Sequence, residues 1–411
     1  MKRREFLQNS AATGLLAAAG PVDLAFGATN DGPDNPVDRV VVIGAGIVGA
    51  SIAYNLSKRG CEIILIDKDG PASQASGNSF AWINASYFDS PDSYFMLRTH
   101  SLNEYHRLAA ELDFPIHWGG SLEWYHSAER EKEVADGIQR IQRQGVPAWM
   151  IDRERAAELE PNVDLGGDWR AAWCSRDGAV DPAATTRALI GGLESNGGRL
   201  IAPAQVSGID QGRNGVTVQS NAGAFSADLV VAAAGADAND IARMIELTTD
   251  LVVPATPGII VTTRPMEPLL NTICYTTDSH FHQLPDGRVI VGEKAGPPKT
   301  EQHAALLTGQ PNVYPNAELA MQHATRVIKS ASKYVGKLAN AEVERVGVGW
   351  RPLPLDGLPT IGHVPDSPRV YLASMHSGVT LAPIVGHLAA MEIMDAVRID
   401  ILDDFRVERF L

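Results

Sequence analysis

Three glycines with the spacing Gly-x-Gly-x-x-Gly stand at Gly44, Gly46 and Gly49, and Asp67 follows 18 residues after the last of them. Binding a dinucleotide explains each position. The first glycine permits a tight turn, the second lets the backbone approach a pyrophosphate at the positive end of a helix, and the third lets helix and strand pack closely. Asp67 is expected to accept a hydrogen bond from a ribose hydroxyl, and an acid here disfavours a 2′-phosphate. The motif predicts a dinucleotide site and argues against NADP.

The residues around these glycines predict a strand, a helix and a second strand, in that order. Arg39 to Ile43 is a β-branched run, Ile47 to Arg59 repeats apolar residues with helical periodicity, and Cys61 to Asp67 is a second apolar run. Glycines also occur in ordinary turns, so the prediction of a dinucleotide site depends on the strand, helix and second strand around them. A parallel βαβ unit therefore positions the glycines at a helix N-terminus.

Downstream of this unit the pattern shifts to helices mixed with short strands. Helices are expected over 91–112, 127–144, 181–196, 316–334 and 381–397. Short strands, expected to be antiparallel, cover 199–202, 206–209, 216–220 and 229–234. A strand-rich stretch from 251 to 291 predicts one exposed antiparallel sheet, and the Pro- and Gly-rich stretch from 351 to 369 is expected to be a loop.

Composition limits the classes of partner. The 411 residues carry a formal charge of −14 at pH 7 without a Lys/Arg cluster, which argues against nucleic acid. The widely spaced Cys61, Cys174 and Cys274 suit neither a metal-binding pattern nor an even-numbered disulfide framework, and we expect core thiols. His280-Phe-His282 has no acid or cysteine at ligand spacing, so the sequence predicts no metal site.

Residues 1–28 have the pattern of an export signal. Arg3 and Arg4 lie in a charged start, and the short apolar stretch from Ala11 to Gly20 is too brief to cross a membrane. The paired arginines resemble the twin-arginine signal, which directs export of folded proteins. The expected location is therefore the periplasm.

Five patches together resemble the D-amino-acid oxidase-like family of FAD-dependent oxidoreductases. Besides the N-terminal unit they are Ala72 to Ser79, Ala204 to Val206, Ala227 to Ala236, and a C-terminal pair formed by 349–362 and 371–383. The resemblance spans nearly the whole chain after the signal. It implies FAD as the dinucleotide. No cysteine stands beside Arg351, where sarcosine oxidases carry a flavin-linking thiol, so the FAD is expected to be non-covalent.

The resemblance also implies which residues contact FAD. In that family the Ser/Gly/Asn-rich segment lies along the pyrophosphate and flavin, a valine backbone meets the adenine, and the start of the last helix faces the flavin's pyrimidine edge. The residues expected to bind the cofactor are Gly44, Ala45, Gly46, Ile47, Val48, Gly49, Asp67, Lys68, Ala75, Ser76, Asn78, Val206, Gly235, Gly378, Val379 and Thr380.

Two residues are expected to act on the substrate, again by resemblance. Arg351 occupies the place of an arginine that holds the substrate carboxylate, and a planar guanidinium can do so through two parallel hydrogen bonds. A structural ion pair is the alternative. His376 is expected to donate to flavin or substrate, with a purely structural histidine as the alternative. The family often has Gly-His-Gly where this chain has Met375-His376-Ser377, which leaves the flavin contacts here open.

Aromatic residues in the strand-rich parts are candidates for the walls of a substrate pocket, with the hydrophobic core as the alternative. They are Trp118, Trp124, Tyr125, Tyr275, His280, Phe281 and His282.

The expected fold class is α/β, with a Rossmann-type FAD-binding domain interleaved with an antiparallel-sheet substrate domain of α+β type. The expected segments are the export signal 1–28, FAD-binding segments 38–112, 177–247 and 342–411, and substrate-domain segments 113–176 and 248–341.

The expected function is oxidation of a small amine or amino acid of D-, glycine or N-methyl type. The resemblance implies hydride transfer from the carbon beside nitrogen to flavin N5, followed by hydrolysis of the imine. Oxygen, a quinone or another carrier then takes the electrons, and export favours a dehydrogenase associated peripherally with a membrane. The alternatives are an FAD-dependent 2-hydroxy-acid dehydrogenase and a non-catalytic flavin-binding periplasmic module.

Overall fold

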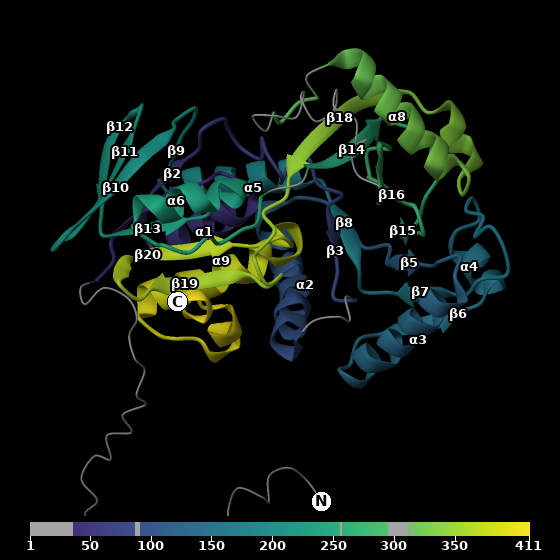
Figure 1. Cartoon of the computed structure of the whole chain (residues 1–411), viewed down its shortest axis with the longest axis horizontal. Coiled ribbons are helices and arrows are strands. Elements are labelled where there is room, and N and C mark those ends of the chain that lie inside the picture. The colour runs from purple at the N-terminus through teal and green to yellow at the C-terminus, as the bar shows by residue number, and fades with distance from the viewer. Residues whose placement is uncertain (1–35, 87–90, 255–256, 295–310, 315) are drawn as a thin grey trace, which may run out of the picture.

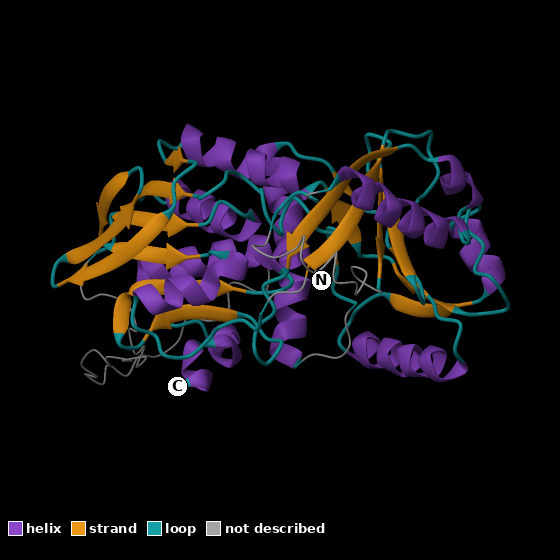
Figure 2. Cartoon of the chain, turned by 45° about the horizontal axis from the view of Figure 1, so that its top comes forward, coloured by secondary structure: helices purple, strands orange, loops and turns teal. Residues whose placement is uncertain are grey.

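The computed structural model describes residues 36–86, 91–254, 257–294, 311–314 and 316–411. The predicted export signal, residues 1–28, lies outside them. The described chain forms two lobes (Figure 1), each built around its own sheet. Turned forward in Figure 2, both sheets are flanked by helices.

The first lobe contains a six-stranded sheet. Its order is β19 (Thr360–Val364), β20 (Ser367–Ser374), β13 (Leu229–Ala232), β1 (Arg39–Ile43), β2 (Glu62–Ile66) and β9 (Arg199–Ile201). All neighbours are parallel except β19, which runs antiparallel to β20. The runs Val-Val-Val-Ile in β1 and Leu-Val-Val-Ala in β13 are buried on both faces, as central parallel strands require.

Helices cover one face of this sheet and a small antiparallel sheet covers the other. The helices are α1 (Ile47–Lys58), α5 (Pro182–Ser195) and α9 (Gly378–Asp395). The opposite face packs against β10 (Val206–Gly212), β11 (Gly215–Ser220), β12 (Gly223–Ala227) and α6 (Ala238–Met244). Val40 and Val42 belong to the first core and Val41 and Ile43 to the second, because side chains alternate along a strand.

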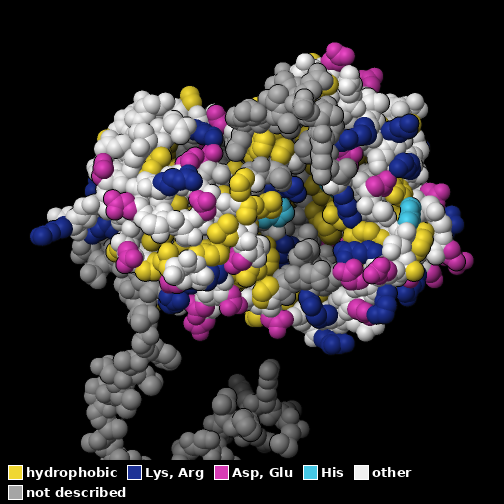
Figure 3. All heavy atoms as spheres, viewed as in Figure 1, with side chains coloured by type: hydrophobic (Ala, Val, Ile, Leu, Met, Phe, Trp, Pro, Cys, Tyr) yellow, Lys and Arg dark blue, Asp and Glu magenta, His cyan; other side chains and the backbone are white. Residues whose placement is uncertain are grey.

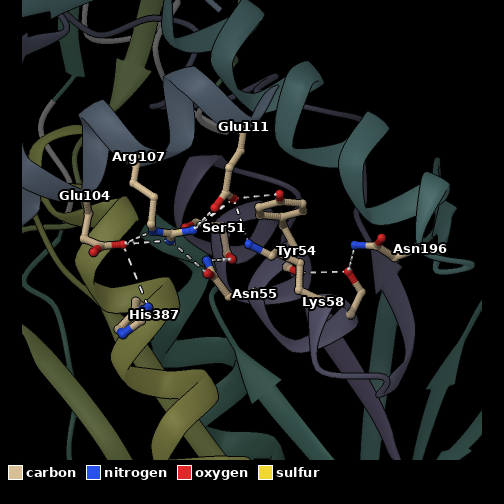
Figure 4. A network of polar contacts seen from close by, with 10 residues as sticks. Ser51, Tyr54, Asn55, Lys58, Glu104, Arg107, Glu111, Asn196 and His387 are labelled. Atoms are coloured by element: carbon tan, nitrogen blue, oxygen red, sulfur yellow. Dashed lines mark hydrogen bonds and ion pairs between the residues drawn. The ribbon is translucent and has the colours of Figure 1, made fainter. Parts of the chain in front are cut away.

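Helix α2 (Asp92–Leu112) is held onto α1 by a polar network (Figure 4). Glu111 accepts hydrogen bonds from the hydroxyl of Tyr54 at 3.0 Å and the ammonium of Lys58 at 2.8 Å. Arg107 bonds both carboxylate oxygens of Glu111 and reaches Glu104 one turn away. Helix α1 also packs against α9, and the hydroxyl of Ser101 in α2 donates to the carbonyl of Thr380 in α9. Together these contacts hold the buried side of α2 against the start of α9.

The second lobe contains an eight-stranded sheet. Its order is β18 (Val343–Trp350), β14 (Pro257–Thr263), β17 (Val289–Glu293), β16 (Ser279–Gln283), β15 (Ile273–Tyr275), β5 (Ser121–Glu123), β7 (Ala171–Cys174) and β6 (Ala148–Ile151). Only the β15–β5 pair among these strands is parallel. Helix α8 (Ala317–Ser332) covers one face, where Leu122, Cys274 and Phe281 join the core. Helices α3 (Ala128–Arg143) and α4 (Arg153–Leu159) complete this lobe.

A three-stranded sheet of β3 (Trp82–Ile83), β8 (Gly178–Val180) and β4 (Ile116–His117) accompanies the segments that connect the lobes. Short 3₁₀ helices lie at Gly235–Asp237, Gly336–Asn340, Asp400–Phe405 and Val407–Phe410. The chain passes from one large sheet to the other and back more than once, so the two lobes are interleaved in sequence. The expected architecture is confirmed, while the exact domain boundaries stay predictions.

Several sequence expectations need correction. β9 and β13 are parallel members of the six-stranded sheet, not antiparallel strands, because their residues are paired with β2 and β1. β19 forms within the expected loop 351–369, since Thr360 to Val364 pairs with β20. Neither β7 nor β12 was predicted from the sequence. Length alone does not distinguish short strands of either orientation, which depend on distant partners.

The three cysteines are buried and free, as expected. Within the described ranges, no single helix has both the length and the apolar character of a membrane span, although the bent pair Gly378–Asp395 and Asp400–Phe410 meets both criteria together. Much of α9 is buried in the first core.

Candidate active site

The glycine turn between β1 and α1 excludes side chains at two positions. Gly44 has φ +105°, and a β-carbon there would lie 2.3 Å from the carbonyl oxygen of Ala233. A β-carbon on Gly49 would lie 2.0 Å from the carbonyl oxygen of Gly44. The first and third glycines are thus required by the packing of β1, α1 and the end of β13.

The N-terminus of α1 fits an anionic ligand. Gly46 is the N-cap and has no side chain of its own to cap the helix, and the first turn contains no acidic residue. The hydroxyl of Ser76 accepts a hydrogen bond from the amide of Ile47 at 3.0 Å. The remaining positive end of the helix dipole suits a pyrophosphate.

Asp67 shapes the same turn. One carboxylate oxygen accepts from the amide of Ala45 at 2.7 Å, and the other accepts from the amides of Asp69 at 2.9 Å and Gly70 at 2.7 Å. A carboxylate offers about four acceptor sites, so a ribose hydroxyl can still bind. Asp67 therefore has a structural role that the sequence did not indicate, in addition to its predicted one.

The other residues expected near the adenosine lie around the carboxyl ends of these strands. Lys68 forms an ion pair with Asp237 at 2.6 Å, just beyond Gly235 in the turn after β13. The amide of Ala204 donates to the carbonyl of Asp67 at 2.7 Å, which brings the start of β10 at Val206 close to β2. In open α/β sheets ligands bind at this edge.

The Ser/Gly/Asn-rich segment is clamped against β18. Asn78 donates to the carbonyls of Ser73 and Gln74 and accepts from the guanidinium of Arg345. β-carbons on Gly347 and Gly349 would lie 2.4 and 2.8 Å from atoms of Asn78. The segment that includes Ala75 and Ser76 is thereby held beside the strand that precedes Arg351.

The last long helix begins at Gly378, as the resemblance implies and three residues before the start that periodicity indicated, and hydrogen bonds from α2 hold its first turn. The hydroxyl of Tyr105 donates to the carbonyl of Val379, and that of Ser101 donates to the carbonyl of Thr380 at 2.6 Å. The hydroxyl of Thr380 in turn donates to the carbonyl of Trp82 at 3.2 Å. The amides of this turn are held rigidly, and their contact with flavin stays a prediction.

Arg98 is a buried cation that the sequence prediction missed. Its side chain, in α2, is 5% exposed and donates to the hydroxyls of Ser377 at 2.7 Å and Tyr94 at 3.3 Å, and to the amide oxygen of Asn84. It lies beneath the N-cap of α9. The signal was available: a charge at position 98 interrupts the helical stripe of Tyr94, Ser101 and Tyr105, all buried.

Strand register brings the substrate candidates onto one face of the eight-stranded sheet. Directly paired residues on neighbouring strands share a face. One row across six strands consists of Gly347, Ile260, Gly292, His280, Tyr275 and Glu123. His282, two residues from His280, lies on the same face, and its Nε2 donates to the carbonyl of Phe80 at 2.8 Å. This face therefore meets the segment that follows the glycine turn.

Arg351 and both candidate histidines are brought together here. Arg351 is exposed directly after β18. Burial, together with the charges of Arg351 and Arg98, lowers the pKa of His376 to about 4. Burial and the charges of Lys294, His282 and Arg351 lower the pKa of His280 to about 3. Both imidazoles are neutral near pH 7 and can act as hydrogen-bond partners without carrying charge.

Aromatic rings line this region. The ring centroids of Phe80 and His280 lie 4.4 Å apart, those of Tyr275 and His280 are stacked at 5.5 Å, and those of Trp82 and Tyr275 lie 5.6 Å apart. Figure 3 shows a hollow between the lobes with hydrophobic side chains and histidine inside it and Lys and Arg along one wall. The site is a partly apolar cleft with cations at its edge.

Three expected pocket residues lie elsewhere. Phe281 and Trp124 alternate with the face residues and are buried in the core beneath α8, at 0% and 1% exposed. Trp118 stacks on His106 of α2 at 4.2 Å and packs against the core of the first lobe. The core alternative is correct for these residues, and for Phe281 and Trp124 the reason is that the pleat of a strand turns every second side chain away.

Asp177 joins the segments on either side of the cleft. Its fully buried carboxylate accepts from the indole of Trp82 at 3.2 Å and from the hydroxyls of Ser86 and Ser121, both at 2.7 Å. Burial raises its pKa to about 6, although these hydrogen bonds act in the opposite direction. This residue positions Trp82 without touching the hollow itself. No cluster of metal ligands occurs among the described residues.

Comparisons with known proteins agree with this geometry. The family described as FAD dependent oxidoreductase matches residues 39–391. Glycine oxidase of Bacillus licheniformis is 26% identical over 90% of this chain and 96% of its own length. A component chain of the opine oxidase of Agrobacterium tumefaciens is 24% identical over 90% of this chain and 97% of its own. The crystal structure of glycine oxidase from Geobacillus kaustophilus superposes with a TM-score of 0.80 at 23% identity, covering 91% of this chain and 100% of that one.

Proposed function

The chain belongs to the FAD-dependent oxidoreductase family, and from this premise we propose that it oxidises a small amine or amino acid whose carboxylate is bound by Arg351. It is an enzyme that uses FAD. The observation that carries the substrate proposal is the convergence of Arg351, His280 and His376 at the cleft. The relatives named for glycine and opine oxidation support the same class.

The residues that hold FAD are those of the glycine turn, Asp67, the segment around Ser76 and Asn78, and the first turn of α9. They fit the cofactor, because the N-cap residue Gly46 has no side chain and the first turn of α1 contains no acidic residue. We expect the binding to be non-covalent, since Arg351 is not flanked by cysteine. FAD held by these residues would supply a hydride acceptor, its N5, for oxidation of the substrate carbon beside nitrogen.

The chain's own residues bind and orient the substrate. Arg351 holds the carboxylate through two parallel hydrogen bonds, which fixes the carbon to be oxidised. The neutral His376 and His280 donate or accept hydrogen bonds, and Phe80 and Trp82 limit the water around the reacting carbon. The first-turn amides of α9 stabilise negative charge that develops nearby. The released imine reacts with water to a carbonyl compound and an amine or ammonia.

The decisive experiment is anaerobic reduction of the bound flavin. The purified protein is mixed with a panel of D-amino acids, glycine and N-methylglycine, and with D-2-hydroxy acids matched to the amino acids, while the flavin absorbance is followed. We expect bleaching by at least one amine and not by its hydroxy counterpart. Bleaching by hydroxy acids alone overturns the amine proposal in favour of the 2-hydroxy-acid dehydrogenase. Reoxidation by oxygen compared with a quinone then identifies the electron acceptor.

We also propose that the protein is exported to the periplasm by the twin-arginine route. Arg3 and Arg4 support this, as does the advantage of loading FAD before export. Fusion of residues 1–28 to a reporter tests it: the reporter is expected in the periplasm, and Arg3→Lys with Arg4→Lys is expected to retain it in the cytoplasm. If the reporter still reaches the periplasm when both arginines are replaced, the twin-arginine route is contradicted.

A further inference from the structure

Lys294 is a cation at the cleft without a carboxylate partner among the described residues. Its Nζ lies over the rings of Tyr125 and Tyr275, 4.3 and 4.2 Å from their centroids. Nearby cations differ, since Arg326 pairs with Glu293 and Lys333 pairs with Asp278. Two ring faces bind an ammonium weakly compared with an anion. Lys294 is therefore available to a negatively charged ligand.

Strand register locates Lys294 relative to Arg351. Ile260 pairs with Gly292 and Gly258 pairs with Gly349, so Lys294, two residues past Gly292, is level with Gly258 and Gly349. Neighbouring strands are about 4.8 Å apart, which places Lys294 about 10 Å across the sheet from Gly349. Arg351 follows Gly349 by two residues on the same face. The two cations thus stand on one face, separated by the strand β14.

The strand between the two cations has a glycine, Gly258, at their level. Among the described residues, a β-carbon on Gly258 would meet nothing closer than 3.7 Å, and the nearest side-chain atom is the Cδ of Arg351 at 3.8 Å. The charges of both Lys294 and Arg351 lower the pKa of the His280 imidazole, so this residue is near both cations. A ligand that spans this surface would present one end to each cation.

The electrostatics of Lys294 favour a carboxylate. The residue is exposed, but partial desolvation of its ammonium lowers the pKa to about 8, and the nearby charge of Glu123 opposes that effect only in part. Glu123 itself accepts a hydrogen bond from the hydroxyl of Tyr125. Lys294 also lines an open pocket of about 570 Å³ with Arg326, Lys329 and Lys333 and the acids Asp278 and Glu293. An anionic group arriving from solvent meets a net positive rim.

We propose that Lys294 binds a second carboxylate of the substrate, so that the enzyme acts on amines with two carboxylates, one bound by Arg351 and one by Lys294. This inference rests on the proposed amine oxidation and names its substrate class. Amino dicarboxylates and secondary amines with a carboxylate on each arm both have this form.

Binding and turnover test the inference separately. FAD-loaded wild-type and Lys294→Met proteins are titrated with glutarate and with its monoamide, and binding is read from the perturbation of the flavin absorbance. The control is Lys132→Met, the same substitution at an exposed lysine of α3 that does not line the pocket. We expect Lys294→Met to weaken glutarate binding about 10-fold and to leave the monoamide within about 2-fold, with no change in Lys132→Met. Equal weakening of both ligands, or of neither, overturns the subsite.

The matched substrates are D-glutamate and D-glutamine, which differ only in the charge of the distal group. We expect the ratio of their kcat/KM values to fall about 10-fold in Lys294→Met through a higher KM for the acid. If the wild-type enzyme has a higher kcat/KM for D-glutamine than for D-glutamate, the second carboxylate site is contradicted, but the proposed amine oxidation is not. Conversely, flavin that no amine reduces removes the proposed oxidation, whereas glutarate binding that still depends on Lys294 supports the subsite.

Discussion

The nucleotide side and the substrate side of the cleft are built in different ways. On the nucleotide side, Gly44, Gly49 and Asp67 lie within one βαβ unit and act largely through backbone amides and excluded volume. On the substrate side, Arg351, His280, Tyr275 and Lys294 come from β15 to β18 and act through their side chains.

This difference indicates how each side tolerates change. A backbone site fails when a side chain intrudes, and no other residue can replace a missing glycine there. A side-chain site loses individual interactions one at a time, because the sheet remains when a surface group is removed. Substitutions should therefore abolish cofactor binding on one side and alter selectivity on the other.

The largest effect is expected for Gly44→Ala. The new β-carbon would lie 2.3 Å from the carbonyl oxygen of Ala233, so β1, α1 and β13 cannot keep their packing. We expect most of the bound FAD to be lost, measured by the ratio of flavin to protein absorbance. Gly60→Ala is the matched control, since Gly60 has φ +87° and a β-carbon there would meet no atom of the described chain within 4 Å. It should cost about 1 kcal/mol and keep its FAD. Equal FAD loss in both variants would contradict the role of close packing.

Next in size is Arg351→Met, which probes the substrate side. We expect kcat/KM for an amine with a carboxylate to fall about 100-fold, because charge-assisted hydrogen bonds are lost, with FAD content unchanged. Arg351→Lys should recover only part of the loss, since an ammonium lacks the planar pair of donors. An equal loss for amines without a carboxylate would show that Arg351 does not bind that group.

Asp177→Asn tests the buried carboxylate that links the segments on the two sides of the cleft. Burial raises the pKa of Asp177 from 3.8 to about 6, so the folded chain binds this proton more tightly than the unfolded chain. The associated stability is fully present below about pH 4 and lost as pH rises through about 6. The stability advantage of wild type over Asp177→Asn should then be about 2.5 kcal/mol larger near pH 4 than near pH 7.5. Thermal unfolding at fixed FAD concentration measures it, and a pH-independent difference would contradict the raised pKa.

The smallest effect is expected for His376→Gln. Burial and two neighbouring cations lower the pKa of His376 to about 4, so the imidazole is neutral and does not titrate near pH 7. Glutamine can replace a neutral hydrogen-bond partner, and we expect kcat/KM to fall less than about 10-fold with an unchanged pH profile between about pH 5.5 and 8. Disappearance of an ionisation near pH 6 to 7 in the variant would identify His376 as a proton carrier instead.

The nucleotide half was readable from the sequence because its requirements are local. The glycine spacing, the flanking apolar runs and Asp67 fall within 29 residues, and each is dictated by backbone geometry over a single βαβ unit. Helical periodicity placed the start of α9 at Leu381, and the resemblance placed it at Gly378, where it begins. The roles of Arg351 and His376, which came from the same resemblance, stay predictions.

The substrate half was decided by the tertiary structure. Periodicity could not tell that Phe281 faces the core while His280 faces the cleft, nor that β5 pairs in parallel with β15 from about 150 residues further along the chain. Arg98 and Lys294 could be recognised as parts of the site only from their contacts with distant segments. Arg98 donates to the hydroxyl of Ser377, and Lys294 lies over the ring of Tyr125. The sequence by itself determined that a dinucleotide binds, since a short backbone motif suffices for this, and the resemblance to the family implied that the dinucleotide is FAD. Selectivity depends on the register of strands brought together by folding, and only the tertiary structure established that register.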